Sequence, residues 1–285
     1  MRYQICHRTH YAYQEPVTLQ CHTLRLRPRC DATQQVGSFD LKVDPSPIRQ
    51  AALVETDGNH TLRLWFDQVP TRHLTIEATS EVMTYRTNPF DYLAEPWAVY
   101  VPIDYPVTLA ASLQAYLQPP ATIAVSPLVI DLVEQILYGV EGNISFFLTT
   151  LNQRIYEICQ YGTRATGRPW PPGITWAQKF GSCRDFTVLF MAACRAAGLA
   201  ARFVSGYEEG DSRISDRDLH AWAEVYIPGG GWRGFDPTHG LAVSDRHIAL
   251  VASPFPQDTA PVQGTTVEGA QVKSSLETDV RVRVV

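Results

Sequence analysis

The chain has 285 residues, of which 45% are hydrophobic and 19% are charged, and its formal net charge is −5. This length allows a sizeable buried core and favours two domains, and the composition is that of a globular protein, which excludes extensive disorder. Lysine and arginine residues are scattered along the chain, so the basic surface of a nucleic-acid-binding protein is not expected.

The sequence carries none of the usual signals of secretion or membrane insertion. The start of the chain, from Met1 to His7, lacks the apolar run of a signal peptide, and no later stretch approaches the roughly 18 consecutive apolar residues of a membrane span. Six cysteines occur without paired spacing, which argues against a disulfide framework. We therefore expect a cytoplasmic protein with neither a membrane nor a nucleic-acid partner.

The first hundred residues alternate apolar and polar side chains in short runs, which is the pattern of β-strands with one buried face. The runs are Tyr3 to His7, Thr23 to Arg27, Phe39 to Val43, Thr61 to Phe66 and Leu74 to Ala78. Turn-forming residues separate them. They predict an antiparallel β-sandwich within a domain of residues 1–105, which ends in a linking stretch rich in proline and aromatic residues.

A helical spacing of apolar residues begins at about Thr108, within the second domain of residues 106–255. Helices are expected over residues 109–117, 128–138 and 144–159, and a further helix is expected from Cys183 to its C-terminal cap at Gly198. Three strand-like runs follow, over residues 201–207, 220–227 and 232–236, and glycine-rich residues 228–231 join the last two as a hairpin. Residues 106–255 thus combine helices with strands in a second domain.

The last predicted segment covers residues 256–285. Its first part is rich in Pro, Gln, Thr and Gly, and is either a mobile arm or an extended clamp. The run from Val280 to Val285 then alternates apolar residues with arginines, which suits an exposed edge strand. We expect an extended C-terminal arm that ends in a strand.

Cys183 is the candidate catalytic nucleophile. The thiolate is the reactive form of cysteine, and the unpaired N–H groups and dipole at a helix N-terminus stabilise it. Gly181 and Ser182 allow close approach of a substrate to the backbone, so the N–H of Cys183 is a candidate oxyanion donor. A base oriented by a third group is also required. His220 and Asp236 can supply both, because strands of a hairpin lie only about 5 Å apart.

Four motifs follow one another in the second half of the chain. They are Gly181-Ser182-Cys183-Arg184-Asp185-Phe186, Gly198 to Arg202 with Val204-Ser205-Gly206-Tyr207, Leu219-His220-Ala221-Trp222-Ala223-Glu224-Val225-Tyr226, and Gly231-Trp232-Arg233-Gly234-Phe235-Asp236-Pro237-Thr238. In this order they resemble the core of the transglutaminase-like superfamily, specifically its bacterial cysteine protease branch. The resemblance implies an α+β fold, in which a β-rich N-terminal region precedes a papain-like core of helices packed on an antiparallel sheet. It also implies Cys183 as nucleophile, His220 as base and Asp236 as orienting carboxylate.

Three neighbours of the nucleophile are interpreted as non-catalytic. Asp185 is expected to interact with the helix dipole and to form a salt bridge with Arg184 or Arg202. Animal transglutaminases use an indole donor upstream of the cysteine, and Trp170 and Trp176 precede Cys183 here. Large aromatic residues are usually core or wall residues, so packing is the expected role of both tryptophans.

Neither a metal nor a cofactor is predicted. Animal transglutaminases use calcium, but the acidic segment 211–218 lacks the spacing of an EF-hand loop. Cys183, His220, Asp236 and His239 are all possible zinc ligands, yet their wide spacing matches no common zinc pattern. His239 is interpreted as a loop histidine.

The predicted reaction is attack of the Cys183 thiolate on an amide or peptide carbonyl of a protein or peptide substrate. His220 protonates the leaving amine, and a thioester remains. Water as the acceptor makes the enzyme a peptidase or amidase, whereas an amine makes it a transglutaminase. Hydrolysis is favoured because the branch it resembles is usually described as proteases. The alternative from another functional class is a non-catalytic protein-interaction module that keeps the fold. The intact set of Cys183, His220 and Asp236 argues against this alternative.

Overall fold

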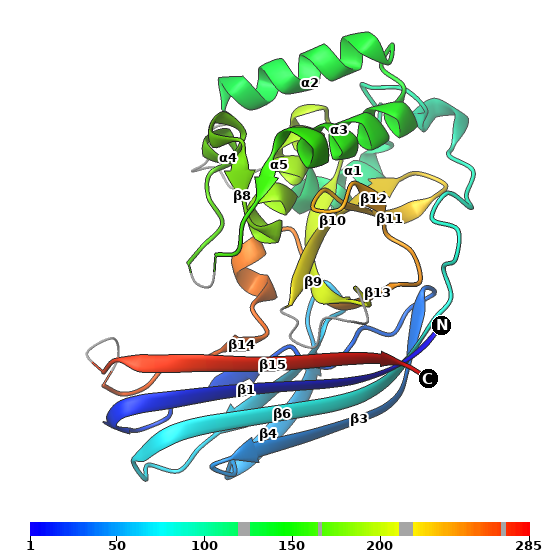
Figure 1. Cartoon of the computed structure of the whole chain (residues 1–285). Helices are drawn as coiled ribbons and strands as arrows, with labels where there is room; N and C mark the ends of the chain where they lie inside the picture. The colour runs from blue at the N-terminus through cyan, green and yellow to red at the C-terminus, as the bar shows by residue number, and fades with distance from the viewer. Residues whose placement is uncertain (119–125, 165–166, 211–218, 269–271) are drawn as a thin grey trace.

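The computed structural model describes residues 1–118, 126–164, 167–210, 219–268 and 272–285. Figure 1 shows helices at one end of the molecule, an antiparallel sheet in the middle and a β-sandwich at the other end. The predicted α+β class, with a sandwich before a core of helices on an antiparallel sheet, is confirmed.

Two four-stranded sheets make up the sandwich in the described part of the chain, with strand orders β15-β1-β6-β3 and β14-β2-β5-β4. The strands are β1 (Arg2–Val17), β2 (His22–Leu24), β3 (Gln34–Asp44), β4 (Arg49–Val54), β5 (His60–Trp65), β6 (Thr71–Thr84), β14 (Val262–Gln263) and β15 (Ser274–Val284). Strand β4 was not predicted. It is an edge strand with almost every residue exposed, so it has no buried face to impose an alternating pattern.

The end of the chain completes both sheets of the sandwich. Strand β15 runs antiparallel to β1 from the pair Tyr3 and Val284 to the pair Tyr13 and Ser274, so it lies beside the first strand (Figure 1). It occupies the sheet edge, as the alternating arginines predicted, but it begins six residues earlier than Val280. The short strand β14 pairs with β2 in the other sheet.

The core domain packs helices on a five-stranded sheet whose neighbours are all antiparallel, in the order β12-β11-β10-β9-β13. Its elements are η1 (Pro96–Ala98), α1 (Val107–Leu117), α2 (Pro127–Gly139), α3 (Ile144–Ile158), β7 (Gln160–Tyr161), α4 (Pro172–Gln178), β8 (Phe180–Gly181), α5 (Cys183–Ala196), β9 (Ala201–Glu208), β10 (His220–Ile227), β11 (Gly231–Asp236), β12 (Leu241–Ala242), β13 (His247–Ser253) and η2 (Pro256–Thr259). The predicted hairpin of β10 and β11 is confirmed.

Helix α5 is the central element of this core. Its buried face includes Phe186 and Phe190, and the ring of Phe190 stacks on that of Phe235 in β11 at 5.5 Å between centroids. Each such side chain contributes about 2 kcal/mol when it is fully buried. Gly198 has φ +76° and donates its N–H to the carbonyl of Arg195, so it caps the helix as predicted.

Strand β13 joins the core sheet to the sandwich. It was not predicted, because the run from Ile248 to Ala252 has no polar residue to give a strand alternation. The side-chain amide of Gln34 both donates to and accepts from the backbone of Ala249, and the amide of Asn59 does the same with Ala252. The pairing of β13 with β9 has an irregular register between Ala249 and Val251. This irregularity explains why the backbone groups of Ala249 and Ala252, three residues apart, both point toward the sandwich.

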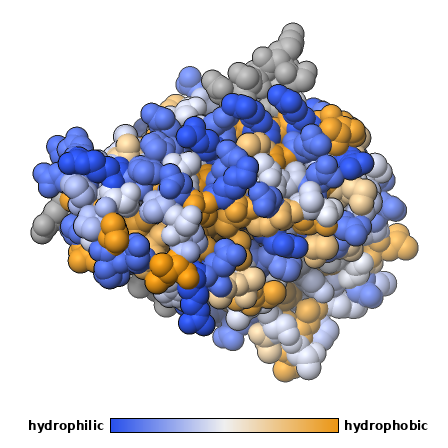
Figure 2. All heavy atoms as spheres, turned by 90° about the horizontal axis from the view of Figure 1, so that it is seen from below, coloured by the Kyte–Doolittle hydropathy of each residue, from blue (hydrophilic) through white to orange (hydrophobic). Residues whose placement is uncertain are grey.

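The outer surface mixes residue types. Hydrophilic residues surround separate apolar ones over the sandwich end of the molecule, which faces the viewer in Figure 2. Such a mosaic is ordinary for a protein surface. Among the helices of the described ranges, none combines the length and apolarity needed to cross a lipid bilayer.

Candidate active site

Cys183 is the first residue of α5, at the helix start that the sequence predicted. The residue is 9% exposed. Ser182 is the N-cap, and both its backbone N–H and its hydroxyl donate to Asp185 Oδ2 at 2.8 Å. Gly181 has no room for a side chain, because a Cβ would lie 2.8 Å from that of Asp185. The sequence around Cys183 therefore holds the thiol at a tightly capped helix terminus.

The carboxylate of Asp185 is completely buried and held from outside the helix. Arg164 Nη1 lies 2.6 Å from one of its oxygens and 2.7 Å from the other, and the N–H of Trp170 donates at 2.7 Å. Burial alone would raise the pKa of Asp185, but these donors lower it below its ordinary value. The prediction of a salt bridge with Arg184 or Arg202 is therefore wrong, because the ion-pair partner of Asp185 is Arg164, which lies 21 residues upstream.

His220 lies between Cys183 and Asp236. Its Nε2 is 2.7 Å from Asp236 Oδ2, which leaves Nδ1 as the nitrogen available to the thiol. Burial alone would lower the pKa of His220, but the Asp236 carboxylate and the hydrogen bond with Cys183 raise it well above its ordinary value. The structure thus brings together the three residues that the sequence selected.

The buried carboxylate of Asp236 has further partners. Its Oδ1 accepts the N–H of Thr238 at 2.9 Å, and its Oδ2 lies 3.3 Å from Nε2 of His247 in β13. Burial alone would raise the pKa of Asp236, yet the histidines beside it lower the pKa well below its usual range. His247 was missed by the sequence reasoning. The available signal was a histidine at the start of an apolar run, shortly after the Asp236 motif.

A second histidine and carboxylate flank His220. The ring of His239 lies 5.3 Å from the ring of His220, and its Nε2 lies 3.0 Å from Glu208 Oε2. That carboxylate raises the pKa of His239. His239 lies in the turn after β11, as its interpretation as a loop histidine predicted. Among the described residues, donor atoms of Glu208, His220, Asp236 and His239 all lie within 4.8 Å of one another and could hold a metal ion.

Trp170, Trp176 and Cys159 have the surroundings of packing residues. Trp170 stacks on the guanidinium of Arg164 at 4.4 Å, and the ring of Trp176 lies against the Lys179 ammonium, so both pack as predicted. Burial raises the pKa of Cys159 to about 11. The acidic segment 211–218 lies outside the described residues.

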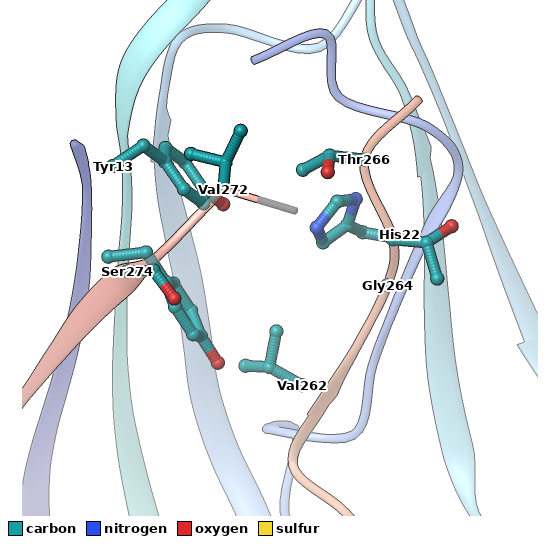
Figure 3. A pocket seen from close by; sticks show the side chains of 9 residues that line it. Tyr13, His22, Val262, Gly264, Thr266, Val272 and Ser274 are labelled. Carbon is teal, nitrogen blue, oxygen red and sulfur yellow. The ribbon is translucent and has the colours of Figure 1, made fainter. Parts of the chain in front are cut away.

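A separate cavity lies within the sandwich. It has a volume of about 340 Å³, and Figure 3 shows Tyr13, Val272 and Ser274 facing His22 and Thr266 across it. These residues come from strands β1, β2 and β15 and from loops beside them, not from the core sheet or α5. The cavity therefore contributes nothing to the cluster around Cys183.

Comparison with known proteins identifies both parts of the chain. A family model of the bacterial transglutaminase-like N-terminal region matches residues 3–83, and a model of the transglutaminase-like superfamily core matches residues 131–237. The crystal structure of a candidate cysteine protease from Cytophaga hutchinsonii covers 100% of this chain and 91% of its own, with a TM-score of 0.76 and 21% identity. The two proteins therefore share their fold.

Two curated relatives extend the comparison to sequence. A protein-glutamine gamma-glutamyltransferase of Pseudomonas aeruginosa is 32% identical over 85 residues, which are 27% of this chain and 13% of that protein. An uncharacterised protein of Mycobacterium tuberculosis strain H37Rv is 30% identical over 97% of this chain and 92% of its own length. Because this similarity spans nearly the whole chain and the family models match both its sandwich and its core, the chain belongs to the transglutaminase-like superfamily.

Proposed function

We propose that the protein is a cysteine-nucleophile enzyme that cleaves amide or peptide bonds through a thioester intermediate. One observation carries the proposal: the imidazole of His220 is hydrogen-bonded to the buried carboxylate of Asp236 on one side and to the helix-start thiol of Cys183 on the other. A nucleophile, a base and a group that orients the base are what this chemistry requires.

Each residue has a defined step in the proposed reaction. His220 Nδ1 takes the thiol proton, and Cys183 Sγ attacks the carbonyl carbon of the substrate. The N–H of Cys183, which has no intrahelical acceptor at this position, stabilises the resulting oxyanion. The C–N bond then breaks as His220 returns the proton to the leaving amine, and a thioester remains. Asp236 orients the imidazole and stabilises its positive charge throughout.

We propose water as the acceptor that resolves the thioester, which makes the enzyme a peptidase or amidase. The side chains of Glu208 and His239 beside His220 are 21% and 44% exposed, so solvent reaches the polar wall of the site. A site that favoured an amine over water would have to exclude water. His220 takes a proton from the attacking water, and the acid product leaves as the thiol is restored.

Amine transfer is the second candidate, and one comparison favours it. The curated relative that matches 27% of this chain is named a protein-glutamine gamma-glutamyltransferase. In that reaction an amine attacks the same thioester, and a new amide forms in place of the acid. The two candidates share the first half-reaction, so they differ only in the product.

Alkylation by iodoacetamide tests the first half-reaction. Peptide mapping follows the rate at each cysteine, and the exposed Cys30 provides an internal standard in the same chain. We expect Cys183 to react faster than Cys30 near neutral pH despite its low exposure, and to lose that advantage in the His220→Ala variant. If Cys183 reacts no faster than Cys30 and is unaffected by the substitution, the enzyme proposal is wrong.

Mass spectrometry of products tests the acceptor. Wild-type and Cys183→Ala proteins are incubated with a peptide library and a tagged primary amine in water enriched in heavy oxygen. Hydrolysis places the heavy oxygen in a new carboxyl group, whereas transfer places the tagged amine on the peptide. We expect the heavy-oxygen product, dependent on Cys183. A tagged product alone would establish amine transfer instead.

A further inference from the structure

Glu208 and His239 have no step in the proposed reaction, yet they lie against its base. Glu208 Oε2 is 3.0 Å from His239 Nε2 and 4.0 Å from His220 Nε2. His220 Nε2 is in turn 2.7 Å from Asp236 Oδ2. In a tetrahedral zinc site, donors that lie about 2.0 to 2.1 Å from the metal are about 3.4 Å from one another. The observed separations scatter around that value.

The donor set favours zinc over other common ions. Two imidazole nitrogens and two carboxylate oxygens suit zinc, whereas calcium and magnesium prefer oxygen ligands alone. With both imidazoles neutral, the two carboxylates carry the charge that balances a divalent cation. The 44% exposed side chain of His239 provides a path from solvent, while Asp236 is completely buried.

The outer contacts of a metal site are also in place. Metal-binding carboxylates are normally oriented by further hydrogen bonds. Asp236 has such support from the N–H of Thr238 at 2.9 Å and from Nε2 of His247 at 3.3 Å, and neither partner belongs to the donor set. The carboxylate therefore keeps its position when His220 Nε2 turns its lone pair to a metal.

We infer that Glu208, His220, Asp236 and His239 bind a zinc ion, and that the bound zinc blocks the chemistry of Cys183. Zinc takes the lone pair of Nε2 in both histidines, so each neutral imidazole carries its single proton on Nδ1. A proton that was on Nε2 moves there through solvent, and the second proton of a charged imidazole returns to the thiolate or passes to solvent. In His220 this protonated Nδ1 faces the thiol. That nitrogen has no lone pair to accept the thiol proton, so Cys183 is not activated. This inhibitory half rests on the proposed function, whereas the binding half does not.

Zinc binding is tested on protein that lacks the nucleophile. Isothermal titration of zinc into a Cys183→Ala, Cys30→Ser variant removes the reactive and the exposed thiol as competing ligands. We expect one ion per chain, and a loss of affinity of about 100-fold or more when His239→Ala or Glu208→Gln is added. Equal affinity in the parent and in both added variants would overturn the inference, as would no binding at millimolar zinc.

A second pair in the chain provides the matched control. His73 Nε2 lies 2.8 Å from Asp44 Oδ2 on the exposed surface of the sandwich. Among the described residues, this pair does not belong to a group of three or more donors that could hold a metal ion. The His73→Ala variant should keep the high-affinity site. Equal losses in His73→Ala and His239→Ala would mean that zinc binds exposed histidine and carboxylate pairs in general, which contradicts the inference.

Cobalt and alkylation separate the metal site from the enzyme proposal. Cobalt bound to wild-type protein should show the visible bands of a tetrahedral nitrogen and oxygen site. A near-ultraviolet sulfur-to-cobalt band that disappears in Cys183→Ala would place the metal on the thiol and overturn the inference. Zinc should slow alkylation of Cys183 in wild-type protein but not in His239→Ala, and a chelator should restore the rate. If zinc binds tightly but Cys183 is alkylated slowly even without zinc, only the proposed function is refuted.

Discussion

Two histidines with little solvent exposure, one in the sandwich and one in the core, have opposite acid–base properties. His7 in β1 lies between the hydroxyl groups of Tyr207 and Thr9, at 2.9 and 3.1 Å, and burial lowers its pKa to about 4. His220 in β10 is also shielded from solvent, yet its pKa is raised well above the ordinary value by Asp236. Burial acts in the same direction at both sites, so the buried carboxylate makes the difference.

The comparison shows how the two regions divide their work. Several contacts between the sandwich and the core join neutral groups, such as the side-chain amides of Gln34 and Asn59 on β13 and the pair of His7 and Tyr207, although the Tyr3 hydroxyl donates to the Glu209 carboxylate. The site uses charged groups that stabilise one another away from water. We infer that the neutral contacts hold the sheet in place, while the charged groups serve the proposed proton transfer. The following changes test that division, in order of decreasing expected effect.

Removal of the carboxylate charge should have the largest effect. Asp236→Asn keeps the shape of the side chain but no longer stabilises a protonated His220, and the same change in a serine-protease triad lowers turnover by about 10⁴. We expect a comparable loss in the rate of thioester formation, measured with a peptide substrate, and slower alkylation of Cys183. Asp67→Asn, at an exposed sandwich position, is the control and should retain full activity.

The buried, neutral side chain of His7 should make the free energy of unfolding depend on pH. The pKa of His7 falls from 6.5 in the unfolded chain to about 4 in the folded protein, so below pH 6.5 the unfolded chain binds the extra proton first. About 3 kcal/mol of unfolding free energy is therefore fully present above pH 6.5 and is lost as the pH falls toward 4. Urea unfolding at several pH values measures it. A wild-type slope that persists unchanged in His7→Gln would contradict this account.

The amide contacts on β13 should have an intermediate effect. Gln34→Ala leaves the buried N–H and C=O groups of Ala249 without this partner, which costs about 1 to 3 kcal/mol of unfolding free energy. Chemical denaturation measures the loss. The exposed neighbour Gln35→Ala should be nearly neutral. Equal stability of the two variants would mean that the sandwich does not hold this strand.

The smallest effect is expected at a second thiol of helix α5, where burial opposes formation of the thiolate. Cys194 is fully buried in the same helix as Cys183, and burial raises its pKa well above the ordinary value. Cys194→Ala should cost about 1 kcal/mol of stability and leave the alkylation rate of Cys183 unchanged. Alkylation of Cys194 in the native wild-type protein at a rate similar to that of Cys183 would show that position beside His220 is not what activates a thiol.

Local patterns predicted what short-range chemistry controls. The capped start of α5, the end of that helix at Gly198 and the hairpin of β10 and β11 each depend on neighbouring residues, and all three were found. Strands with one buried face were also found, whereas the exposed β4 and the fully buried β13 were not. A difference in burial between its two faces makes a strand easy to recognise in the sequence, although β9 was found without such a difference.

The sequence by itself therefore determined which thiol, histidine and carboxylate belong together, because the order of four motifs carries Cys183, His220 and Asp236. Only the tertiary structure decided that Arg164 holds Asp185 and that His247 supports Asp236. It also decided that Glu208 and His239 lie beside His220 and Asp236 in one cluster of donor atoms. These contacts join residues from different elements of the fold, and their spacing along the chain carries no local signal.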